Sequence, residues 1–351
     1  GEGVVRGVGF AVGFKTICYP EGFDDSTAAR VRLFERDGGL AATVETVRPE
    51  WRDPEYGHRL TQLRALRAAQ PGRPLVLVVG SSRTQMAVSP AAMRFAAPAA
   101  APLVYNFGQS GAGPLRMFLT VERLAEAGIV PDVLLVEFFP AAFAADGPAK
   151  VQLKDSVARL SWADLRILTP FTADAAGLRR RWAGERANSW HSLRLVLMSH
   201  ALPNWMAWRD RLSHQWEMLD PFGFTPYPRE AVGDEERAAG LARVRDQYAG
   251  LMSNYSVGAM SDRVFRELLE RCRGRGVRVV LFRTPEGPSF RALARPAAGR
   301  VADYLAGRDV IESTGEYVED EFSDGHHMLP AGATRYSVDL ARGLAARGLV
   351  A

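Results

Sequence analysis

Residues 74–83 read PLVLVVGSSR, and this stretch indicates the fold. Residues 75–79 form an unbroken, mostly β-branched apolar run without helical spacing, which predicts a strand buried on both faces of a parallel sheet. Gly80 allows a sharp turn where that strand ends. Because open α/β sheets bind ligands at the carboxyl ends of their strands, we expect Ser81 and Ser82 at the ligand-binding edge. A hydroxyl group there is a candidate nucleophile.

A serine is a weak nucleophile unless a base removes its proton, so a histidine must reach the same edge. The best candidate lies near the C-terminus, where residues 324–329 read DGHHML. Asp324 and His327 are three residues apart, in a loop predicted to precede the last helix. This spacing allows the carboxylate to bind one imidazole nitrogen and leaves the other nitrogen free to face a serine.

The same segments have simpler interpretations. Ser81 and Ser82 can form a polar turn, and residues 324–329 can form a surface loop that caps the last helix. The pair His326 and His327 also suggests a metal site. Adjacent histidines in a loop usually point apart, however, and no other His or Cys has ligand spacing. We therefore expect neither a metal nor a cofactor.

The chain resembles the SGNH (GDSL-type) hydrolases and acyltransferases in three places. GSS at residues 80–82 resembles their GDS block, and DGHHML resembles their terminal D-x-x-H-L block. This resemblance implies Ser82 as nucleophile, His327 as base and Asp324 as acid. Residues 104–111, VYNFGQSG, are similar to the second block. The resemblance implies that the N–H groups of Gly111 and Ser82 bind the oxyanion.

The chain departs from the third block of that family, which ends a strand in G-x-N-D. Here the predicted strand at residues 133–137 continues into Phe138, Phe139 and Pro140, and the Asn is absent. GSSR in place of GDS is found in extracytoplasmic, polymer-modifying acyltransferase branches of the family. The resemblance covers residues 74–140 and 276–348.

Four further polar residues lie close to these blocks in the sequence. Arg83 and Arg283 are candidates for holding an anionic or polar substrate group, although either can instead form a structural salt bridge. Asn106 is a candidate for substrate binding or for bracing the serine loop. Gln109 is a further candidate donor to the substrate.

Alternating strands and helices, with connections long enough for crossovers, predict a three-layer α/β/α domain at residues 74–348 with a mostly parallel sheet. The resemblance implies the SGNH-hydrolase, flavodoxin-like form of this fold. Residues 1–73 are expected to be an N-terminal extension with a lead-in helix. Residues 141–260 show helical patterns such as 205–218 and 235–252 without a convincing strand, which indicates a helical insertion or cap. One helix is expected over residues 290–305.

Composition limits the partners. The formal net charge is +4 and arginines are mixed with acids, so we expect no nucleic-acid partner. Cys18 and Cys272 are too few for a disulfide framework. The first residue is Gly1, and the apolar stretch 3–11 is too short to span a bilayer. We expect a signal or anchor segment ahead of it, an extracytoplasmic location in preference to a cytoplasmic one, and membrane association through that segment alone.

The sequence thus predicts a serine esterase or O-acyltransferase that acts on acetyl or other short-chain O-acyl esters, including those of carbohydrates, through an acyl-enzyme. The alternative is an inactive SGNH-like module that binds an acylated glycan or a partner protein in an envelope assembly complex. A nucleotide binder is disfavoured because the chain has neither G-x-G-x-x-G nor a P-loop. The oligomeric state stays open.

Overall fold

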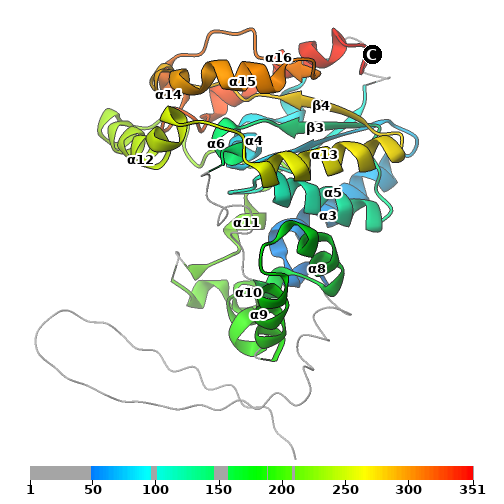
Figure 1. Cartoon of the computed structure of the whole chain (residues 1–351). Coiled ribbons are helices and arrows are strands. Elements are labelled where there is room, and N and C mark those ends of the chain that lie inside the picture. Colours follow the sequence, from blue (N-terminus) through cyan, green and yellow to red (C-terminus); the bar gives the residue numbers. More distant parts are fainter. Residues whose placement is uncertain (1–48, 96–100, 146–156, 188, 208–209, 351) are drawn as a thin grey trace, which may run out of the picture. The chain divides into compact units, whose positions relative to one another are not determined.

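The computed structural model describes residues 49–95, 101–145, 157–187, 189–207 and 210–350. All of them belong to the compact unit Glu35–Ala351. Its centre is a five-stranded, all-parallel sheet of order β2-β1-β3-β4-β5 (Figure 1). The strands are β1 (Leu75–Val79), β2 (Leu103–Asn106), β3 (Val133–Glu137), β4 (Arg278–Phe282) and β5 (Val310–Ile311).

The strand order reverses beside β1. Val76 of β1 is in register with Val104 of β2 on one side and with Val133 of β3 on the other. The order 2-1-3-4-5 is that of flavodoxin-like folds, which bind ligands in the crevice at this reversal. The carboxyl ends of β1, β2 and β3 therefore lie at the edge of the sheet where such folds bind ligands.

Helices cover both faces of the sheet, which confirms the predicted α/β class. Leu75, Leu77 and Val79 point into a cluster with α3 (Pro54–Ala69), α5 (Pro114–Glu126) and α13 (Ala259–Gly274). Val76 and Val78 point into a second cluster, with α16 (Pro330–Ala345). Burial on both faces explains why the strand is a continuous apolar run.

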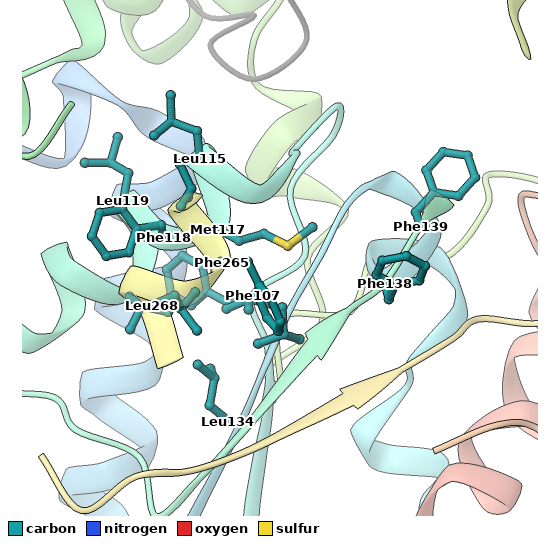
Figure 2. Close-up of a cluster of buried hydrophobic side chains, with 14 of the residues drawn as sticks. Phe107, Leu115, Met117, Phe118, Leu119, Leu134, Phe138, Phe139, Phe265 and Leu268 are labelled. Atoms are coloured by element: carbon teal, nitrogen blue, oxygen red, sulfur yellow. The ribbon is translucent and has the colours of Figure 1, made fainter. Parts of the chain in front are cut away.

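The first cluster contains side chains from distant parts of the chain. Figure 2 shows Phe118 of α5 near Phe265 and Leu268 of α13, with Leu134 of β3 in the same cluster. The remaining helices are α2 (Pro49–Arg52), α4 (Ser82–Ala87), α6 (Pro140–Phe143), α8 (Trp162–Leu168), α9 (Ala175–Ala187), α10 (Ser189–Ala201), α11 (His214–Glu217), α12 (Asp234–Ser253), α14 (Pro288–Ala294) and α15 (Ala298–Leu305).

Two expected helices are shorter than predicted. The helix expected over residues 290–305 is divided into α14 and α15 by a 3₁₀ turn, Arg295–Ala297, that contains Pro296. Proline has no N–H to donate and clashes with a continuing helix, which explains the break. The prediction of one helix over residues 205–218 is wrong. A 3₁₀ turn ends at Trp205, and α11 begins only at residue 214.

Residues 141–260 contain no strand in the portion that the structure describes, as expected, but they divide into two groups of helices. Helices α8, α10 and α11 pack on α5, α2 and α3 respectively, while α12 packs on α14 near the carboxyl edge of the sheet (Figure 1). Of the expected N-terminal extension, residues 1–48, with Cys18, lie outside the described residues. No helix that the structure describes is long and apolar enough to span a bilayer.

Candidate active site

The turn after β1 separates the roles of its two serines. Ser81 is the N-cap of α4, and its Oγ accepts a hydrogen bond from the N–H of Arg83 at 3.2 Å. Ser82 is the first residue of the helix, so its N–H has no partner within the helix. Its Oγ lies 2.8 Å from Nε2 of His327. Ser81 therefore shapes the turn, and Ser82 faces the histidine.

His327 is held from its other side by Asp324. The Nδ1 of His327 lies 2.8 Å from Oδ2 of Asp324, and the backbone N–H of His327 donates to Oδ1 at 2.9 Å. An ionised carboxylate can only accept a hydrogen bond, so the imidazole proton is on Nδ1, and Nε2 is left as the acceptor for the Ser82 hydroxyl. The three side chains form one continuous hydrogen-bonded chain.

The electrostatics of Asp324 favour an ionised carboxylate. Burial alone raises its pKa, but the close contacts with His326 and His327 outweigh burial and hold the pKa well below its usual range. The carboxylate is therefore ready to stabilise a charged His327 imidazole.

The neighbouring histidine, His326, is buried and neutral at ordinary pH. Burial, and then electrostatic repulsion between the charged forms of the two neighbouring imidazoles, lower its pKa to about 4. Its Nδ1 lies 3.1 Å from Oδ1 of Asp324 without a well-directed hydrogen bond, so this contact is electrostatic. Its ring stacks on Phe290, with centroids 5.2 Å apart.

The expectation that the two adjacent histidines point apart is wrong. Their ring centroids are 4.1 Å apart because both rings turn toward the carboxylate of Asp324. Potential ligand atoms of Asp324, His326 and His327 lie within 4.8 Å of one another. Both ring nitrogens of His327 are already engaged, so a metal ion would have to break the chain from Ser82 to Asp324 in order to bind.

The loop after β2 presents the N–H of Gly111. Gly111 has φ +69°, a conformation that favours glycine. The other N–H groups of residues 108–112 are bonded, to Asn106 Oδ1 (from Gly108), Gly80 O (from Gln109), Glu55 Oε1 (from Ser110) and Gln109 O (from Ala112). Within the described part of the chain, the N–H of Gly111 has no acceptor. It remains available to a ligand.

Ser82 and Gly111 border the same cavity, which has a volume of about 60 Å³. Gln247 and Tyr248 of α12 contribute to its wall, together with Ser81, Arg83, Ala112, Gly113, Phe139, Ala141, Ala142 and His326. One water requires roughly 10–15 Å³ measured in this way, so the cavity suits a group of only a few heavy atoms. Among the described residues neither the Ser82 N–H nor the Gly111 N–H has a protein acceptor, and both residues border this cavity.

Glu137 is a site residue to which the sequence analysis assigned no role. It ends β3, is fully buried, and accepts hydrogen bonds from the N–H of Ser81 at 2.6 Å and the hydroxyl of Thr84 at 2.9 Å. It therefore fixes the serine turn from the neighbouring strand. The signal was a single carboxylate at the end of the apolar run VLLVE, since a buried charge needs partners.

The other four candidates are placed in different surroundings. Asn106 is fully buried and donates to the carbonyls of Thr84 at 2.9 Å and Val88 at 2.6 Å, so it braces α4 behind Ser82. The Oε1 of Gln109 accepts from Thr120 at 2.8 Å, and Gln109 is not among the residues that border the cavity.

Arg83 borders the cavity but is largely engaged in the protein. Its Nη2 donates to Thr284 O at 3.0 Å and to Glu286 Oε1 at 3.3 Å, and its guanidinium lies 4.3 Å from the Phe139 ring centroid. Arg283 borders a neighbouring cavity instead and pairs with Glu312 at 3.4 Å. Only Arg83 of this pair is therefore positioned to act on a ligand beside Ser82.

Comparison with known proteins identifies no relative, because no family model and no curated protein matches the sequence.

Proposed function

We propose that the chain is a serine esterase or O-acyltransferase of the SGNH type, acting through Ser82, His327 and Asp324. The observation that carries the proposal is the continuous series of hydrogen bonds from Ser82 to Asp324, at a cavity that Ser82 and Gly111 both border. An activated serine next to prearranged donors is the constellation that acyl transfer requires.

In the first half-reaction, Nε2 of His327 takes the Ser82 proton while Oγ attacks the ester carbonyl. The N–H groups of Ser82 and Gly111 stabilise the oxyanion, and each such donor is worth about 3–4 kcal/mol. His327 then gives its proton to the departing alcohol, and the acyl group remains on Ser82. Asp324 keeps the imidazole oriented and stabilises its charged form throughout.

In the second half-reaction, an acceptor hydroxyl gives its proton to His327 and attacks the acyl carbonyl. The bond between the acyl group and Ser82 Oγ then breaks, and His327 returns the proton to Ser82. Water as the acceptor releases the acid, and a carbohydrate hydroxyl gives a transferred ester. The cavity of about 60 Å³ supports a short acyl group such as acetyl. An ester of a carbohydrate is the substrate class that we propose.

The test is covalent labelling with a fluorophosphonate probe, together with hydrolysis of p-nitrophenyl acetate. We expect labelling at Ser82 that disappears in Ser82→Ala. Ser81→Ala is the matched control, because it removes the adjacent hydroxyl and costs only the N-cap, about 1 kcal/mol of stability. Absence of labelling and turnover in the folded wild-type protein would refute the proposal and favour a binding module.

A further inference from the structure

Helix α3, which precedes the sheet, reaches the proposed oxyanion loop through a buried carboxylate. Glu55 lies in the first turn of α3 and is 5% exposed. Its Oε1 accepts the backbone N–H of Ser110 at 3.0 Å. Ser110 directly precedes Gly111, whose N–H is the unbonded donor of that loop.

A second, parallel connection runs from the N-cap of the same helix. Asp53 accepts from Arg116 Nη2 at 3.2 Å, and Arg116 Nε donates to Gln109 Oε1 at 3.3 Å. The hydroxyl of Thr120 donates to the same Gln109 oxygen at 2.8 Å. The two residues before Gly111 are thus both tied to the start of α3, one through a backbone group and one through a side chain.

We propose that Glu55 is a positioning residue for the oxyanion site, whose carboxylate holds the Ser110 N–H and so sets the direction of the Gly111 N–H. This inference rests on the proposed function. Hydrogen bonds to an ionised acceptor are roughly twice as strong as those to a neutral one, and burial strengthens them further. Oxyanion donors stabilise a transition state only when they are fixed in advance, so the restraint on the loop acts on kcat.

The test compares Glu55→Gln with Glu55→Met. The two new side chains have a similar size, but Gln keeps an acceptor oxygen and Met has none. With p-nitrophenyl acetate, we expect Glu55→Met to lower kcat about 10²-fold, the scale of a 1 Å misplacement, with KM nearly unchanged. Glu55→Gln keeps a neutral acceptor and should lose only a few-fold. Hydrogen–deuterium exchange of residues 107–113 should become faster in both variants, and more so in Glu55→Met than in Glu55→Gln, because the Ser110 amide loses its partner.

Two controls separate positioning from stability. Glu122 of α5 is equally buried and pairs with Arg271 and Arg275, but it does not contact the loop. Glu122→Gln should lower the melting temperature without changing kcat or loop exchange. Ser110→Ala should leave the loop exchange unchanged, because Glu55 binds the backbone N–H and the Ser110 side chain is exposed.

Unchanged loop exchange in Glu55→Met overturns the inference regardless of activity, and so does faster exchange with an unchanged kcat. If Glu55→Met does not fold, the test rests on Glu55→Gln. Loop exchange and kcat that both equal those of the wild type in that variant would overturn the inference. An inactive, unlabelled wild-type protein refutes the proposed function itself, and the positioning role of Glu55 with it. Labelling of the wild type together with unchanged loop exchange in the variants refutes the role of Glu55 alone.

Discussion

The Oγ of Ser82 lies 2.8 Å from Nε2 of His327, although the two residues are 245 positions apart in the sequence. Both residues are held close to regular structure. Ser82 begins α4 directly after β1, and His327 precedes α16, which packs against α4. The contact therefore depends on how α16 is seated on the sheet. Four consequences can be measured.

Gly80 leaves no room for a side chain in the serine turn. A Cβ built there would lie 1.9 Å from Oγ1 of Thr84 and 2.7 Å from Oε2 of Glu137. We expect Gly80→Ala to displace the turn, to lower the free energy of unfolding by about 1–3 kcal/mol through overpacking, and to reduce kcat. The measurements are denaturant unfolding and ester hydrolysis.

Gly184 provides the matched control, because it lies in the last turn of α9 and a Cβ built there would have no described neighbouring atom within 4 Å. Gly184→Ala should stabilise the protein by about 0.5–1 kcal/mol and leave hydrolysis unchanged. Equal effects of the two substitutions would contradict this account of the turn.

The carboxylate of Glu137 should be needed for stability as well as for activity. In Glu137→Gln, the amide oxygen can still accept from the Ser81 N–H and the Thr84 hydroxyl, as Oε2 does now, but an NH₂ group replaces Oε1, which accepts from the Thr284 hydroxyl and lies 3.9 Å from Nε of Arg83. We expect a loss of about 1–3 kcal/mol in the free energy of unfolding, together with a lower kcat. Glu312→Gln, at a half-exposed surface pair, should stay within about 0.5 kcal/mol of the wild type.

Titration of His326 should make stability fall in mildly acidic solution. The unfolded histidine takes up a proton near pH 6.5, whereas the folded one stays neutral down to about pH 4. The unfolded state therefore binds more protons between these values, and the free energy of unfolding falls by about 3 kcal/mol as the pH falls through this window. Asp324, whose pKa is lowered, loses its contribution only at pH values below 3.8.

Unfolding by urea at pH 7, 6, 5 and 4.5 checks this prediction. His326→Phe keeps an aromatic ring beside Phe290 and removes the titrating group, so its stability should change less with pH than that of the wild type. The prediction fails if both proteins show the same dependence on pH.

Tyr248 should limit the length of the acyl group. It borders the cavity from α12, and its ring packs edge-on against Phe139 and Phe290. We expect Tyr248→Ala to raise kcat/KM for p-nitrophenyl butyrate relative to the acetate by about tenfold, the usual range for one or two methylenes. Trp162→Ala, which removes an exposed side chain on α8, should leave this ratio unchanged. If the ratio of kcat/KM for butyrate to that for acetate does not change in Tyr248→Ala, another residue that borders the cavity limits the acyl length.

A site residue could be predicted from the sequence only where a short local sequence pattern marks it. Ser82, Asp324 and His327 each lie in a short local pattern, a strand with its turn or a loop before a helix, and such patterns can be recognised without the fold. Glu55, Glu137 and Tyr248 carry no such pattern. Their contacts with the site join segments 53 or more residues apart, and one buried acid or one aromatic resembles many others.

The sequence by itself determined the parallel α/β class, the strands that carry the site and the two segments that meet there, because an apolar run followed by glycine has few alternative structures. The tertiary structure decided that Ser81 caps α4 while Ser82 faces His327, that Asn106 braces α4, and that α12 rather than α8 or α10 borders the cavity. The physical reason is that backbone preferences are local, whereas the direction of a buried polar group is set by whichever distant partner satisfies its hydrogen bonds.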